Sequence, residues 1–150
     1  MKLTFLAFGF QGDGPKAGEW EDQEEFAEEQ GLMGRLIHLL VSPDPDQQYN
    51  ILSTARKHFG TGGALRIGSS LPPLVVAAYR LVKVYYDIRE QDDKWEKKAA
   101  KIFQFCHATI AALVKADMAE VPLRMYLLGV LALDKVGTIF HSTSTESTLY

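Results

Sequence analysis

The sequence predicts an all-α protein in which antiparallel helix pairs stack as a short HEAT-like α-solenoid segment. Apolar residues recur at helical spacing in successive segments, and outside residues 1–10 no stretch alternates with the period of two that a strand requires. The predicted helices are joined alternately by short turns and loops, so each helix pair occupies about forty residues. Such a pair cannot bury its apolar face alone and must stack on a neighbour.

The length of 150 residues fits one domain, in which we distinguish three regions. Residues 1–20 are expected to form an irregular N-terminal extension, because residues 11–18 are rich in glycine and include a proline. Residues 21–137 are predicted to form a helical solenoid segment of about five helices. Residues 138–150 are rich in serine and threonine and are expected to be a disordered polar tail.

The first helix is predicted to begin near Asp22 and to end near Val41. Its first half is acidic, which suits the positive end of the helix dipole. Its residues at helical spacing predict an apolar face made of Phe26, Met33, Leu36, Ile37 and Leu40.

The second helix is predicted to follow the turn at residues 42–44. Asp44 is a good N-cap, Pro45 suits the first helical position and Gln47 would complete a capping box. Gly60 is placed to end the helix. A connection this short predicts that the first two helices are antiparallel neighbours.

The third helix is predicted to open near Leu71, after a loop at residues 61–70. The loop contains glycines but lacks the Gly-Lys-Ser/Thr ending of a phosphate-binding loop. Pro72 and Pro73 would lie in the first helical turn, where a missing N–H costs least. The predicted apolar face consists of Leu74, Val75, Ala78, Leu81, Val82 and Tyr85.

Two further helices are predicted. Asp93, with Glu96 three residues later, would cap the fourth helix, and the fifth would begin near Pro122. The apolar stripe of the fourth helix contains Trp95, Ala99, Ile102, Phe103, Cys106, Ile110 and Leu113. The fifth helix carries Leu123, Tyr126, Leu127, Val130 and Leu131.

The sequence contains no recognisable catalytic or metal-binding pattern. No histidine lies in a His-Glu-x-x-His arrangement or at ligand spacing from a cysteine, and no serine lies in Gly-x-Ser-x-Gly. His38 and His107 are flanked by apolar residues, so we expect them to be packed or half-buried. The single cysteine, Cys106, lies on an apolar stripe, which predicts a buried, inert thiol and fits a reducing compartment. We therefore expect no enzyme activity, no cofactor and no metal.

The charge pattern indicates neither a nucleic-acid partner nor a membrane-spanning segment. The net charge is -3, and seven of the nineteen acidic residues lie within residues 19–29. The remaining chain has only a small, dispersed excess of bases, unlike the clustered basic face of nucleic-acid-binding proteins. No stretch approaches the ~20 apolar residues of a spanning helix, and residues 1–10 lack the cleavage site of a signal peptide.

Five short blocks within residues 22–137 resemble, in the same order, the family of the large α-solenoid subunit of retromer, vacuolar protein sorting-associated protein 35. They are Asp44-Pro45-Asp46-Gln47-Gln48-Tyr49, Ala55-Arg56-Lys57-His58-Phe59-Gly60, Leu71-Pro72-Pro73-Leu74-Val75, the block from Asp92 through Trp95 to Lys98, and Val121-Pro122-Leu123-Arg124. These blocks resemble the C-terminal half of the family. Their residues are candidates for either a structural or an interface role.

The resemblance implies a non-catalytic scaffold of a retromer-like complex, which binds partner subunits through helical surfaces. Such a complex retrieves proteins from endosomes to the Golgi or the plasma membrane, and its location is cytoplasmic, peripheral on the cytosolic face of endosomes. The implied partner is the retromer subunit of metallophosphoesterase fold, with other subunits and cargo binding the full-length family. Residues 1–20 and the sequence after Gly137 do not resemble the family. An alternative is therefore a truncated or splice-variant fragment with no independent assembly role.

Overall fold

The structure is a computed structural model that describes residues 20–116, 118 and 120–137. It contains the helices α1 (Trp20–Leu39), α2 (Pro45–Phe59), α3 (Ala64–Asp87), α4 (Trp95–Lys115) and α5 (Glu120–Gly137). The described part of the chain contains no strand, which confirms the predicted fold class. Nearly all of the expected N-terminal extension and the whole expected polar tail lie outside the described residues.

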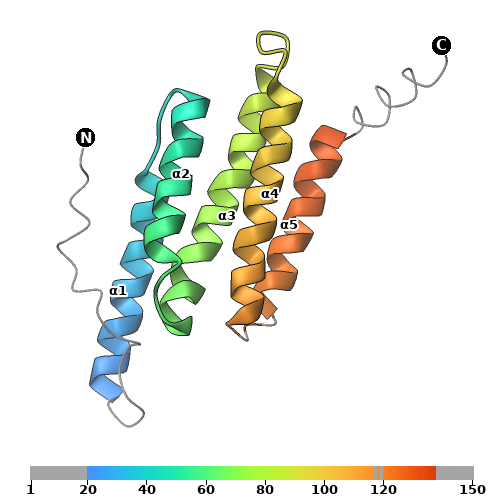
Figure 1. Ribbon diagram of the computed structural model, residues 1–150. Helices are drawn as coiled ribbons and strands as arrows, with labels where there is room; N and C mark the ends of the chain where they lie inside the picture. The colour runs from blue at the N-terminus through green and yellow to red at the C-terminus, as the bar shows by residue number, and fades with distance from the viewer. Residues whose placement is uncertain (1–19, 117, 119, 138–150) are drawn as a thin grey trace.

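The helices run up and down in two layers (Figure 1). α1, α3 and α5 form one layer, and α2 and α4 cover it on one side. α3 is the central helix because it packs against each of the other four. α1 and α2 are antiparallel, as predicted, but each packs mainly on α3 and much less on the other. The stacking agrees with an α-solenoid segment.

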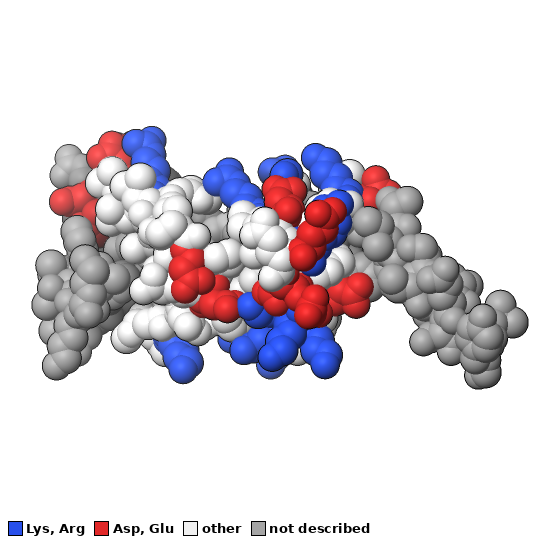
Figure 2. All heavy atoms as spheres, turned by 90° about the horizontal axis from the view of Figure 1, so that it is seen from above, with Lys and Arg blue, Asp and Glu red and all other residues white. Residues whose placement is uncertain are grey.

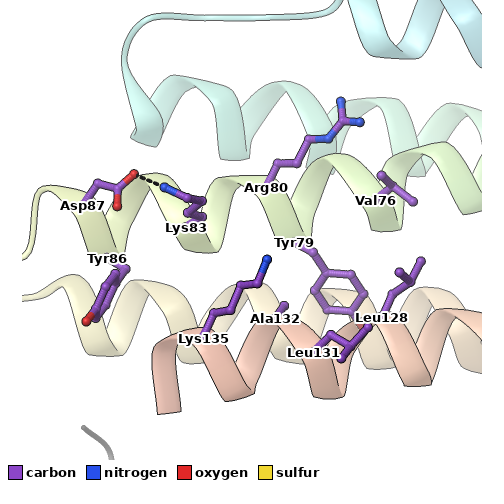
Figure 3. Close-up of a pocket in the computed structure, with 10 residues that line it drawn as sticks. All are labelled: Val76, Tyr79, Arg80, Lys83, Tyr86, Asp87, Leu128, Leu131, Ala132 and Lys135. Atoms are coloured by element: carbon purple, nitrogen blue, oxygen red, sulfur yellow. Dashed lines mark hydrogen bonds and ion pairs between the residues drawn. The ribbon is translucent and has the colours of Figure 1, made fainter. Parts of the chain in front are cut away.

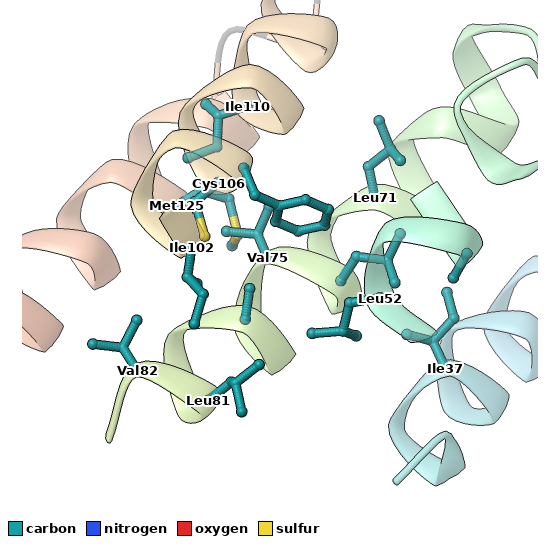
Figure 4. Close-up of a cluster of buried hydrophobic side chains, with 14 of the residues drawn as sticks. Ile37, Leu52, Leu71, Val75, Leu81, Val82, Ile102, Cys106, Ile110 and Met125 are labelled. Atoms are coloured by element: carbon teal, nitrogen blue, oxygen red, sulfur yellow. The ribbon is translucent and has the colours of Figure 1, made fainter. Parts of the chain in front are cut away.

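The core is a continuous apolar cluster to which all five helices contribute (Figure 4). The predicted apolar face of α3 is entirely buried, and so is the predicted stripe of α4 except Phe103, which is partly buried. The most deeply buried large side chains include Leu52, Leu74, Ile110 and Leu113. Since α3 packs against each of the other four helices, it holds the two layers together.

α3 begins seven residues earlier than predicted, so Pro72 and Pro73 lie inside the helix. Each proline removes the N–H that would bond to the carbonyl four residues earlier. Tertiary packing offsets this loss: Ile67 packs against the core, and Leu71 is only 1% exposed. The buried Ser70 hydroxyl also donates a hydrogen bond of 2.8 Å to a carbonyl four residues earlier in the helix. The prediction of a loop up to Ser70 was therefore wrong.

The start of α4 also differs from the prediction. The N-cap position is Lys94, which makes no side-chain capping bond, so Asp93 is not the cap. Instead the Asp92 carboxylate accepts a hydrogen bond of 2.9 Å from the Lys94 N–H, and the Asp92 carbonyl accepts one from Trp95. The chain thus enters α4 through a turn anchored at Asp92, which holds Trp95 at the edge of the core.

One residue of the predicted apolar face of α1 is misplaced. Met33 and Ile37 are buried and Leu40 packs against the core, but Leu36 is 45% exposed. Gln30 is buried in its place, 3% exposed. The helix therefore presents a face to α3 that is slightly rotated from the one that apolarity alone predicts.

Candidate protein-interaction surface

The first family block forms the junction between α1 and α2. Asp44 caps α2 as predicted, accepting a hydrogen bond of 3.0 Å from the Asp46 N–H. Gln47 does not complete a capping box, because its side chain accepts a bond from the Ser42 hydroxyl. Gln48 joins the two helices: it accepts from the Ser42 N–H at 2.6 Å and donates to the Leu40 carbonyl at 2.8 Å. These polar side chains fix the turn between α1 and α2.

Asp46 is the centre of a polar cluster that connects three helices. One carboxylate oxygen accepts a hydrogen bond of 2.6 Å from the hydroxyl of Tyr85 on α3. The other accepts one of 2.8 Å from the ammonium of Lys98 on α4, which also pairs with Asp92 at 2.7 Å. The ammonium of Lys98 also lies 5.4 Å from the centre of the Tyr85 ring. We call Asp46, Tyr85, Asp92 and Lys98 the polar cluster.

The polar cluster shifts the pKa of each of its members. The hydrogen bond from Lys98 is the largest cause that lowers the pKa of Asp46, and the same is true of Asp92. The bond to Asp46 is in turn the largest cause that raises the pKa of Lys98. Burial, followed by the bond to Asp46, raises the pKa of Tyr85. All four shifts favour the protonation states that hold the cluster together at neutral pH.

These shifts predict a loss of stability in acid. Asp46 and Asp92 have folded pKa values below their ordinary value of 3.8, so their contribution is complete above 3.8 and is lost as the pH falls through the folded pKa values. Urea unfolding between about pH 5 and about pH 2 should show this fall. In Lys98→Met the fall should be clearly shallower. In Lys97→Met, which changes an exposed neighbour, it should match the unmodified chain; equal slopes in both variants would contradict this role of Lys98.

The second family block lies at the other end of α2. The Arg56 guanidinium donates a hydrogen bond of 3.1 Å to the carbonyl of Ala108 on α4 and lies 5.8 Å from the centre of the Phe105 ring. Phe59 is buried in the core, whereas Lys57 and His58 are exposed. The contact between α2 and α4 is completed by Tyr49, whose ring meets the Phe105 ring edge-on at 6.1 Å.

Gly60 ends α2 as predicted. The reason for a glycine is close packing of the backbone and not a left-handed conformation. Its φ of -75° is open to any residue, and its N–H donates to the Arg56 carbonyl at 2.8 Å. A Cβ atom at this position would lie only 2.8 Å from that same carbonyl oxygen. The glycine therefore allows a tight C-terminal turn that a larger residue would open.

Further family residues contribute to the packing of α3 and α4. Leu71 and Leu74 are buried in the core, and the half-buried Pro72 and Pro73 belong to α3. Pro73 faces Gly34 of α1, where a Cβ atom would lie 3.5 Å from the proline ring. Trp95 is buried at 8% exposure, and its ring meets that of Tyr86 edge-on.

The family residues thus do not converge on one site. They form the α1–α2 junction, the polar cluster, the α2–α4 contact and the core, and several of them, including Lys57, Lys97 and Leu123, are exposed. No group of three metal-ligating side chains occurs among the described residues. Cys106 is buried, as predicted, and burial raises the pKa of its thiol to about 12.

Both helical histidines for which packing was expected are exposed. His107 lies beside Tyr126, with 3.2 Å between its Nδ1 atom and the tyrosine hydroxyl. His38 lines a hollow between the α1–α2 junction and α3. The prediction of burial from apolar sequence neighbours was wrong, because adjacent residues on a helix point in different directions.

The most conspicuous surface feature is the apolar outer face of α5. All five residues that the sequence singled out in this helix are exposed, while the helix packs on the core through Pro122, Met125 and Gly129. The exposed fractions are 61% for Leu123, 56% for Leu127, 60% for Val130 and 59% for Leu131. At the opposite edge of the layer, α1 exposes Leu32, Leu36 and Leu39. A solenoid presents such faces where another repeat or a partner would pack.

Charged side chains do not form a single basic or acidic face. Figure 2 looks down on the end of the array that carries the α1–α2 and α3–α4 connections, where acidic groups gather across the middle and basic groups lie along both margins. The polar cluster belongs to this end. No helix within the described residues is both long and apolar enough to cross a membrane.

Comparisons with known proteins agree with this architecture. The family model of vacuolar protein sorting-associated protein 35 matches residues 7–148. The chain is 36% identical over 118 residues to vacuolar protein sorting-associated protein 35A of Arabidopsis thaliana, and 36% identical over 117 residues to vacuolar protein sorting-associated protein 35 of Dictyostelium discoideum. The first of these alignments covers 76% of this chain and the second 74%, yet each covers only 15% of the relative.

The family match extends further than the five sequence blocks. It includes residues 7–20 and 138–148, so the prediction that these residues do not resemble the family was wrong. The chain belongs to the vacuolar protein sorting-associated protein 35 family.

Proposed function

We propose that this chain is a non-catalytic scaffold segment of a retromer-like complex in endosomal protein sorting. The observation that supports this is the stacked helical array, in which many family residues pack in the core or join helices, and which presents broad helical surfaces to partners. The relatives are named for vacuolar protein sorting. The proposed routes are retrograde transport from endosomes to the Golgi and return from endosomes to the plasma membrane.

The proposed partner is the retromer subunit of metallophosphoesterase fold. We place the complex on the cytosolic face of endosomes, where the chain is held peripherally through its partners. The two layers offer two separate surfaces, one on α2 and α4 and one on α1, α3 and α5. A rigid scaffold binds through such preformed surfaces without a catalytic group.

Co-purification with the phosphoesterase-fold subunit tests this proposal. The unmodified chain should retain the subunit, and a bulky charge on the contacting layer should reduce retention. Gln104→Arg tests the α2–α4 layer and Val84→Arg the other, since both positions are exposed and lie outside the polar cluster. Each variant is the control for the other. A chain that melts cooperatively yet retains no subunit would contradict the proposal.

A second candidate is a fragment without an independent assembly role. The exposed apolar faces of α1 and α5 favour it, because unpaired solenoid faces reduce stability and promote self-association. The sequence suggested this candidate because the terminal residues did not resemble the family. The family match includes most of these residues and so removes that reason. A broad, non-cooperative thermal melt by circular dichroism, together with absent subunit binding, would favour this candidate.

A further inference from the structure

A groove between α3 and α5 combines an apolar floor with a basic rim (Figure 3). Its volume is about 420 Å³, within the ~300–1,000 Å³ range of small-molecule sites. The apolar lining comes from Val76 and the Tyr79 ring on α3 and from Leu128, Leu131 and Ala132 on α5. The groove lies between two helices of one layer, and it shares Leu131 with the exposed apolar face of α5.

The rim of this groove carries an excess of positive charge. Arg80, Lys83 and Lys135 line it, opposed by Asp87 alone, and Asp87 already pairs with Lys83 at 2.6 Å. In the described part of the chain, the side chains of Arg80 and Lys135 make no hydrogen bond or ion pair. In Figure 3 the Lys135 side chain extends from α5 toward α3, above the apolar lining. Arg80 turns to the other side of α3, where it also lines the hollow next to α1.

We propose that this groove binds a single-chain amphipathic carboxylate of the fatty-acid class. The apolar floor would remove the alkyl chain from water, at about 25 cal/mol per Å² of buried apolar surface. The Lys135 ammonium would bind the carboxylate, because Lys83 already pairs with Asp87 and the Arg80 side chain turns away from the groove. A cationic amphiphile of equal chain length would make the same apolar contacts, but Lys135 would repel its head group. The inference does not depend on the scaffold role.

Titration calorimetry and methyl NMR on the full chain can test the site. The probes are laurate, dodecyltrimethylammonium and dodecyl maltoside, which share a chain length and differ in head-group charge, each below its critical micelle concentration. Laurate should bind saturably at one site, shift the Leu131 and Ala132 methyl signals, and bind at least about tenfold more tightly than the cation. Equal affinity for the three probes would overturn the proposal, as would binding of laurate only when it is presented in phospholipid vesicles.

Two variants test the head-group contact. Lys135→Gln should weaken laurate binding about five- to tenfold, because a charge-assisted hydrogen bond is lost from a partly desolvated site. Lys115→Gln removes an exposed charge at the end of α4, outside the groove, and should leave the affinity unchanged. The affinity for dodecyl maltoside, which has no charge, should be the same in the Lys135→Gln and Lys115→Gln variants. Unchanged laurate affinity in a folded Lys135→Gln variant would also overturn the proposal.

Discussion

Replacing Leu74 with alanine is expected to lower the free energy of unfolding by about 3–5 kcal/mol. Leu74 is 0% exposed and lies on α3, the helix that contacts all four others, so the cavity would open where the layers meet. Part of the loss is the transfer free energy of the deleted methyl groups, and part is the cavity that neighbours cannot fill. Urea unfolding followed by far-UV circular dichroism gives the difference.

Leu65→Ala is the matched control, since Leu65 lies on the same helix and is 53% exposed. Both substitutions replace a leucine of α3 by alanine, and the main difference between the two positions is burial. We expect its effect to stay within about 0.5 kcal/mol, as for most surface substitutions. A similar loss in both variants would mean that α3 is not the structural centre of the array.

Gly129→Ala is expected to destabilise the contact between α3 and α5 by about 1–3 kcal/mol. A Cβ atom at Gly129 would collide with the hydroxyl of Tyr79 and would lie 2.9 Å from its Cζ atom. The ring has little freedom to move, because it also packs against Phe103, with 6.0 Å between the ring centres. The glycine thus lets α5 approach α3, and a larger residue would separate them. Thermal melting provides the measurement.

Two further variants separate this collision from ordinary helix propensity. Gly31→Ala changes an exposed glycine of α1 whose Cβ would meet no atom within 4 Å, so it should stabilise the fold by about 0.5–1 kcal/mol. In the Gly129→Ala background, Tyr79→Phe removes the colliding hydroxyl and should restore part of the loss. Destabilisation by both glycine substitutions, or no recovery by Tyr79→Phe, would contradict the steric explanation.

Some roles of the family residues could be predicted from the sequence, and others could not. Asp46 was predictable as part of the α2 start, because its neighbour Asp44 is an N-cap type followed by a proline. Its contacts with Tyr85 and Lys98 were not predictable, since those residues lie 39 and 52 positions away in the chain. The same holds for Arg56, whose carbonyl partner is 52 positions away. Local spacing contains no information about such distant contacts.

The α3–α5 groove could not have been predicted either. Its apolar and basic residues come from two helices separated by α4, and each helix alone resembles an ordinary amphipathic surface. The packing of α5 on α3 through Gly129 brings them together.

The sequence by itself determined the all-helical class, the existence of the five helices, most inward-facing residues of α3 and α4, and the α2 caps. It could do so because helical periodicity and capping depend on residues within about four positions of each other. Only the tertiary structure decided that α3 continues through Pro72 and Pro73, that Leu36 and the apolar residues of α5 face outward, and that Asp46 joins three helices. Each of these depends on which helix packs against which, and burial against a distant segment can outweigh the local preference of a proline or a leucine.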